Sequence, residues 1–153
     1  MNKPLAVGLA VVTAPVWLPL VVFVAAAYLV TVAILYVIVW TWWIGFAERR
    51  VLFVYSDSPL WKDHVEQRIL PRLPRNTVVL NWSQRLRWPR LSLAVLLFHT
   101  FAGGREFNPI ALVFERFAFV DRFRFWQPFR DAKHGKVEPL ASLESALVER
   151  LQR

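Results

Sequence analysis

The sequence predicts a single α/β domain preceded by an apolar membrane anchor, with the boundary between residues 47 and 48. Two observations predict this class. No charged side chain occurs between Leu5 and Ala47. After Glu48, short β-branched or aromatic runs alternate with segments of helical periodicity,. Such alternation is typical of a sheet that carries helices on its faces.

The uncharged segment is too long to be hidden in the core of a small domain. In helical form, residues 5–47 would extend for roughly 65 Å, about twice the hydrocarbon thickness of a bilayer. Pro15 and Pro19 each remove a backbone donor and disfavour helix in the preceding residue, so we expect a bend near them,. The favoured arrangement is a helical hairpin with a short helix at about residues 5–14 and a full span at about residues 20–44. The alternative is one transmembrane helix with a buried leader.

Residues around the end of this segment predict its orientation. Three tryptophans occur between residues 40 and 43, where amphipathic rings prefer the headgroup layer,. Arg49 and Arg50 follow at once, whereas Lys3 stands alone on the amino-terminal side. The apolar run continues well beyond the small residues Ala25–Ala27, which argues against a cleaved signal peptide,. The positive-inside rule therefore predicts an integral protein of a bacterial-type inner membrane, with its carboxy-terminal domain in the cytoplasm.

Four strands are expected in the soluble part. Runs rich in β-branched and aromatic residues predict buried strands at residues 51–55, 77–80 and 110–114,. Phenylalanines at alternate positions predict a fourth strand within residues 117–125. The last two strands follow each other directly, which favours an antiparallel hairpin.

Three helices are expected between and after these strands. Ser58 followed by Pro59 is a helix start, and apolar residues at helical spacing continue from there to about Leu70,. The apolar residues 91–101 predict a second helix that ends at a glycine pair,. Residues 140–151 carry apolar side chains on one side and predict the last helix. The expected order of the domain is therefore β-α-β-α-β-β-α.

With this order, two local motifs give the chain a resemblance to a known fold. The turn Ser56-Asp57-Ser58-Pro59 follows the first strand and leads into a helix, and Asn108-Pro109 opens the third strand. Over about residues 50–151 the chain resembles the thioredoxin-like fold superfamily. The resemblance implies that the turn stands where the family has its active-site loop, and that Pro109 is the family's structural cis-proline.

The chain departs from that superfamily in having no cysteine. Thiol–disulfide exchange requires a thiolate nucleophile, which serine at an ordinary pKa cannot replace. The sequence therefore excludes disulfide oxidoreduction, and it excludes a disulfide framework or a zinc–thiolate site for the same reason.

Ser56, Asp57 and His64 are the candidate catalytic residues. A hydrolase could use them with the histidine as base, but no G-x-S-x-G motif accompanies them,. The favoured interpretation is that the serine and aspartate cap the turn and the helix that follows it. No two histidines have the spacing of metal ligands, so we expect neither a metal site nor a cofactor.

Basic residues dominate the middle of the domain, because no acidic residue occurs between Glu66 and Glu106. Such a face would attract the anionic headgroups of the membrane to which it is tethered. A scattered solvated surface and a single-strand nucleic-acid site are the alternatives, and the absence of an RNA-binding signature favours the membrane. The residues predicted to face the membrane or to bind anions are Arg49, Arg50, Arg72, Arg75, Arg85, Arg87, Arg90, Trp82 and Trp88.

An aromatic run from Phe117 to Phe129 exceeds what one sheet face needs, and part of it could form a partner-binding edge or rest on the bilayer,. Together these features predict a membrane-anchored, redox-inactive interaction or assembly module with a membrane or cytoplasmic protein as partner. Two other functions stay open at this point. One is a small membrane-associated enzyme that acts on a lipid or an anionic substrate, and the other is a basic nucleic-acid-binding domain.

Overall fold

The computed structural model describes residues 3–89 and 91–152. The chain forms two compact units, Met1–Val37 and Ile38–Arg153. The second unit thus begins before the expected boundary at residue 48. It does so because the last turns of the apolar segment bury side chains within the sheet domain.

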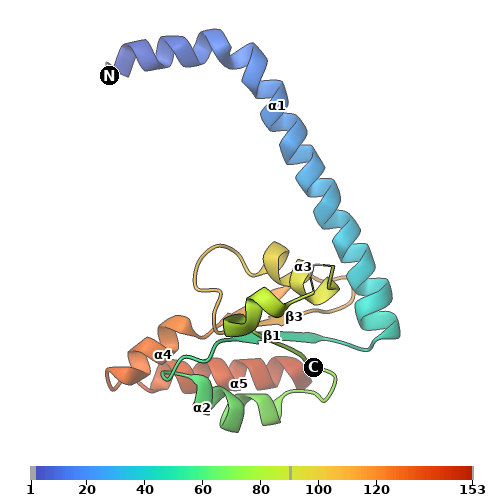
Figure 1. The fold of residues 1–153 in the computed structure, drawn as a ribbon, viewed down its shortest axis with the longest axis vertical. Helices are drawn as coiled ribbons and strands as arrows, with labels where there is room; N and C mark the ends of the chain where they lie inside the picture. The colour runs from blue at the N-terminus through green and yellow to red at the C-terminus, as the bar shows by residue number, and fades with distance from the viewer. Residues whose placement is uncertain (1–2, 90, 153) are drawn as a thin grey trace. The chain divides into compact units, whose positions relative to one another are not determined.

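The first unit is made by a single helix, α1 (Lys3–Ile38), which continues into the π-helix η1 (Val39–Phe46). The expected hairpin of two helices is wrong, since α1 includes both Pro15 and Pro19 without interruption. The blue part of the ribbon nevertheless changes direction along α1 (Figure 1). A proline removes one hydrogen bond and crowds the preceding turn, which bends a helix but does not have to end it.

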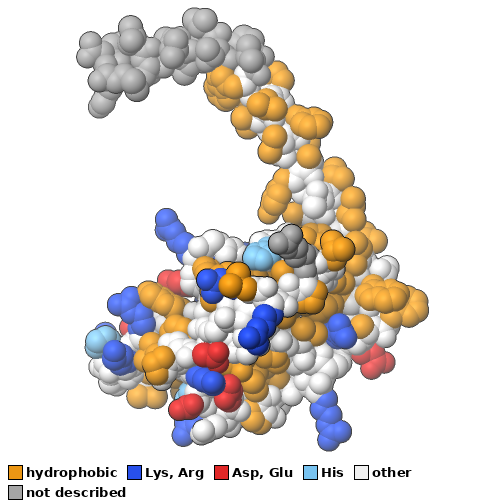
Figure 2. All heavy atoms as spheres, viewed as in Figure 1, with side chains coloured by type: hydrophobic (Ala, Val, Ile, Leu, Met, Phe, Trp, Pro, Cys, Tyr) orange, Lys and Arg blue, Asp and Glu red, His pale blue; other side chains and the backbone are white. Residues whose placement is uncertain are grey.

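The segment Trp17–Phe46 is long and apolar enough to cross a bilayer. Its side chains point outward from the helix, as the orange surface of α1 in Figure 2 shows. Phe23 is 70% exposed and Leu29 is 66% exposed. These side chains form an exposed apolar surface along the helix,.

The second unit is built on a four-stranded mixed sheet with the order β2-β1-β3-β4. β1 (Val51–Tyr55) pairs in parallel with β2 (Val78–Asn81) and antiparallel with β3 (Ile110–Val113), which pairs antiparallel with β4 (Asp121–Arg124). The four predicted strands are confirmed. β2, however, is half-buried where a buried strand was expected, because it lies at the edge of the sheet.

One face of the sheet is covered by the helical segments that follow β1 and β4 (Figure 1). These are α2 (Lys62–His64), η2 (Val65–Ile69), η3 (Leu70–Arg72), α4 (Trp126–Lys133) and α5 (Glu138–Gln152). The alternation of side chains along a strand sends every second residue of β1 and β3 to this face. The buried residues of this core include Phe53, Tyr55, Val65, Ile69, Ala111, Val113, Phe125, Phe129, Leu140 and Leu147.

The other face of the sheet carries α3 (Leu93–Phe101), with the short helix η4 (Trp82–Arg87) beside it. Phe114, directly after β3, packs its ring against Phe101 at 5.9 Å and against Trp43 of η1 at 6.2 Å between centroids. Trp43 is 1% exposed, so η1 is part of the core on this side.

Two features differ from the sequence-based expectation. α4 was not predicted, and its Pro128 lies in the first turn of the helix, where a missing N–H removes no intrahelical hydrogen bond,. Phe117 and Phe119 were expected in the fourth strand, yet they lie in the connection before β4. The Asn108–Pro109 peptide bond is cis.

Candidate functional site

The turn after β1 is the first candidate site. Asp57 accepts hydrogen bonds from the side chain of Asn81, at 3.0 Å, and pairs with the Lys62 ammonium at 3.1 Å. Its backbone N–H donates to the hydroxyl of Ser83 at 3.0 Å. The turn is therefore tied to the end of β2 and to the start of η4, which are its neighbours at this edge of the sheet.

These partners favour the charged forms of Asp57 and Lys62. The hydrogen bond from Asn81, followed by that from Lys62, holds the pKa of Asp57 below its ordinary value. The carboxylate in return raises the pKa of Lys62, mainly through the same hydrogen bond. A carboxylate that stays ionised and bound in this way is suited to hold the turn, and poorly suited to take up a proton as a general base.

Ser56 is buried and has a partner of its own. Its hydroxyl oxygen accepts a hydrogen bond from the indole N–H of Trp61 at 3.2 Å, and the serine is only 9% exposed. Ser58 forms local hydrogen bonds, since its hydroxyl accepts from the N–H of Leu60 and its carbonyl from the N–H of Lys62. It does not cap the helix as predicted, because α2 begins at Lys62 with Trp61 at its N-cap. Neither serine has a histidine as hydrogen-bond partner within the described residues.

His64 belongs to a different cluster. Its Nε2 lies 2.5 Å from a carboxylate oxygen of Glu144 on α5, and the other oxygen of Glu144 is 3.5 Å from Arg72. The edge of its ring contacts Phe129 on α4. This cluster joins the helices on one face of the sheet. Ser56, Asp57 and His64 therefore have three separate sets of partners, and the structure does not bring them together as a catalytic group.

The residues predicted to form one basic face lie on both sides of the sheet. Arg72 pairs with Glu144 of α5, whereas Arg85 stacks over Trp82 at 5.2 Å beside α3. Trp82 itself packs against Trp88, Phe98 and Phe107 in an aromatic cluster. The two tryptophans thus serve this cluster and are half-buried.

Other members of that set are spread along the chain. Arg49 stacks over Trp43 at 5.4 Å, directly after η1. Arg75 and Arg87 are exposed, and Arg90 lies outside the described residues. The sequence could indicate the excess of positive charge but not its distribution, because the elements that carry the arginines fold onto opposite faces.

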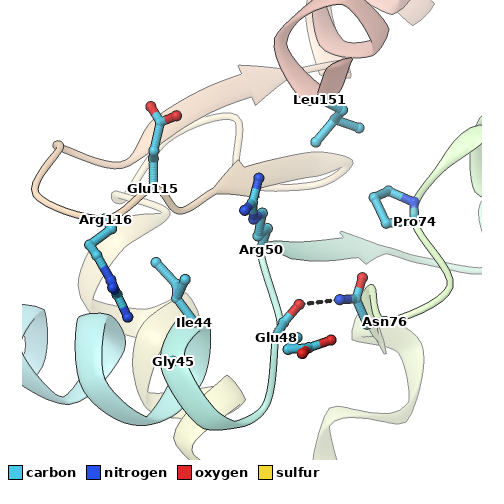
Figure 3. Close-up of a pocket in the computed structure, with 9 residues that line it drawn as sticks. All are labelled: Ile44, Gly45, Glu48, Arg50, Pro74, Asn76, Glu115, Arg116 and Leu151. Carbon is cyan, nitrogen blue, oxygen red and sulfur yellow. Dashed lines mark hydrogen bonds between the residues drawn. The ribbon is translucent and has the colours of Figure 1, made fainter. Parts of the chain in front are cut away.

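A charged cleft that the sequence did not indicate lies where the end of η1, the start of β1 and the end of α5 meet (Figure 3). Its volume is about 840 Å³. Arg50 and Arg116 line it together with Glu48 and Glu115. Both arginines are exposed, and in the part of the chain that the structure describes neither forms an ion pair with a carboxylate.

The walls of the cleft are held by interactions at its two sides. The side chain of Asn76 donates a hydrogen bond to the carbonyl of Glu48, as the dashed line in Figure 3 marks. Arg150 of α5 pairs with Glu115 at 2.5 Å and with Asp121 at 2.7 Å. The Arg150 hydrogen bond and charge, with a smaller contribution from the charge of Arg50, hold the pKa of Glu115 below its ordinary value, so this carboxylate stays ionised and paired with Arg150. The cleft thus presents two guanidinium groups that remain available to an anionic group.

Among residues 3–89 and 91–152, no group of three His, Asp or Glu side chains is arranged to hold a metal ion. Comparison of the chain with protein-family models, with curated proteins and with solved structures gives no match.

Proposed function

We propose that the protein is a membrane-anchored, redox-inactive module of thioredoxin-like fold that binds a protein partner at the cytoplasmic surface of the membrane. The sheet order, with one parallel and two antiparallel pairs and helices on both faces, supports the fold. The exposed apolar segment Trp17–Phe46 supports the anchor. The absence of cysteine removes the chemistry that such a fold otherwise performs,.

The charged cleft is the observation that carries the binding role. Arg50 and Arg116 stand in a concave surface, exposed and without an ion-pair partner among the described residues. Arginine guanidinium groups bind carboxylates in a planar, bidentate geometry and are common in protein interfaces. A partner that places acidic side chains or a chain terminus in the cleft would pair with these guanidinium groups.

The enzyme hypothesis lacks such an observation. Ser56 accepts from Trp61, Asp57 is bound by Asn81 and Lys62, and His64 contacts Glu144. A nucleophile, its base and an orienting carboxylate must be within hydrogen-bond reach of one another. The three residues are better explained as supports of the turn and of the helix packing.

Crosslinking of the full chain in native membranes, followed by affinity purification in detergent, tests the proposal. The unchanged protein should recover a defined polypeptide, and the double variant Arg50→Glu/Arg116→Glu should lose most of it. Arg68→Glu is the matched control because Arg68 is exposed in η2 and does not line the cleft. Equal recovery by all three proteins would contradict the proposed site. A turnover that is lost in Ser56→Ala would instead establish an enzyme.

A further inference from the structure

The connection between β3 and β4 exposes two large aromatic side chains. Phe117 is 78% exposed and Phe119 is 85% exposed. Phe117 also has a backbone φ of +61°, in the left-handed region that bulky residues rarely adopt,. Exposure of two phenylalanine side chains is costly in water, and a nearby apolar medium would remove that cost.

This connection contacts the last turns of the apolar segment. The ring of Phe117 lies 5.3 Å from the ring of Trp40, between centroids. A methyl group added at Gly45 would lie 3.4 Å from Nη2 of Arg116. Because η1 is part of the same compact unit as the sheet, these contacts place the connection alongside η1.

The contact with Trp40 sets the depth of the connection relative to a bilayer. Trp40 and Phe46 both belong to the apolar segment Trp17–Phe46. Trp40 lies in η1, less than two turns before Phe46. Interfacial segments bury their apolar faces by about 5–10 Å at the boundary between headgroups and acyl chains. A bilayer that covers the apolar segment therefore reaches Phe117 as well.

The exposed side of η1 also carries large aromatic side chains. Trp42 is 61% exposed and Phe46 is 80% exposed, and their rings are 5.8 Å apart. Arg49 follows η1 and stacks over Trp43, and Arg116 directly precedes Phe117, so each aromatic pair has an arginine close to it in the sequence. Aromatic rings with adjacent arginines are typical of the membrane–water interface, where the guanidinium reaches the phosphates.

We propose that residues 115–120 form a membrane-binding loop, which inserts Phe117 and Phe119 into the headgroup layer of the cytoplasmic leaflet next to η1. The loop and η1 then hold the domain at two points, which fixes the side of the domain that faces the lipid. This inference rests on the membrane placement in the proposed function and does not depend on the protein partner.

The absence of cysteine allows a direct test, because one introduced thiol can be labelled at a single position. Phe119→Cys, labelled with an environment-sensitive NBD fluorophore, is reconstituted as full chain into phosphatidylcholine/phosphatidylglycerol vesicles with and without doxyl-labelled lipid. Val137→Cys is the matched control, since Val137 is an apolar side chain, 60% exposed, between α4 and α5. Val30→Cys, from the exposed surface of α1, reports on the apolar segment itself.

We expect doxyl lipid to quench the label at position 119 several-fold more than the label at position 137, and aqueous iodide to quench it less. Equal quenching at 119 and 137, with strong quenching at 30, would overturn the loop proposal and leave the anchor intact. Protection of position 119 from both quenchers would mean that protein covers the loop, which also overturns the proposal. Lack of lipid quenching at position 30 would overturn the membrane placement and the proposed function together.

Discussion

Tyr55 occupies the end of β1, with its ring in the core and its hydroxyl at the boundary with solvent. The residue is 8% exposed, and its hydroxyl donates a hydrogen bond to Glu66 at 2.9 Å. Burial, together with the hydrogen bond and the negative charge of Glu66, raises the pKa of Tyr55 to about 12. The folded protein therefore favours the neutral phenol, whereas an unfolded tyrosine ionises near pH 10.

This difference predicts how stability depends on alkaline pH. The contribution of the neutral phenol is complete below about pH 10 and is lost as the pH rises from about 10 to 12. Tyr55→Phe should remove that part of the alkaline loss, and should cost about 1 kcal/mol near neutral pH through the missing hydrogen bond. Denaturant unfolding of the full chain in detergent, measured from pH 7 to 11, tests this. Tyr28→Phe is the control, and an unchanged slope in Tyr55→Phe would contradict the prediction.

Helices and strands whose own residues show a clear pattern could be predicted from the sequence. β1 was expected within its observed bounds because five apolar, largely β-branched or aromatic residues precede a polar turn. α4 was missed because its Phe129 belongs to an aromatic run that begins in the strand region, so the run fits either a longer strand or a strand followed by a helix. Only the pairing of β4 with β3 separates the two possibilities, and a pairing is not visible in one segment of sequence.

The candidate sites were harder to predict than the helices and strands, because they depend even more on contacts between distant segments. The turn around Asp57 was located correctly because its polar residues are consecutive. The partners of that turn, and the contact of His64 with Glu144, join residues from different elements and depend on the folded sheet. The sequence indicated Arg50 as an anion-binding residue but not the cleft, since the walls come from η1, from the segments before β1 and β2, from the connection after β3 and from α5. A single sequence does not show which residues from distant elements come into contact in the folded protein.

The end of α3 offers a test of an element boundary. Gly103 follows α3 with a φ of +80°, a conformation that costs a residue with a Cβ roughly 1 kcal/mol,. Gly103→Ala should lower the free energy of unfolding by at least that amount, because the helix stop requires this backbone conformation and the added methyl group would lie 3.1 Å from Nη2 of Arg124,. The neighbouring Gly104→Ala is the control, since nothing lies within 4 Å of the added methyl group. Equal stability of the two variants in denaturant unfolding would argue against this account of the stop.

At the scale of the whole molecule, charge and apolar surface are separated along the chain. The net charge is +8, and Lys3 is the one charged residue before Glu48. This asymmetry predicts that the carboxy-terminal domain stays in the cytoplasm. A carboxy-terminal epitope should resist protease in intact spheroplasts and should be digested in inverted membrane vesicles. Digestion in intact spheroplasts would show the opposite orientation.

The burial of Trp43 in the sheet domain has a practical consequence for studies of the isolated domain. A fragment that starts at Glu48 would lack Val39 and Trp43, which are 0% and 1% exposed, and would uncover Phe114. A fragment that starts at Ile38 would keep this packing but retain the exposed Trp42 and Phe46. Either way an apolar surface meets water, so we expect truncation at the obvious charge boundary to yield aggregates, and the longer fragment to require a mild surfactant.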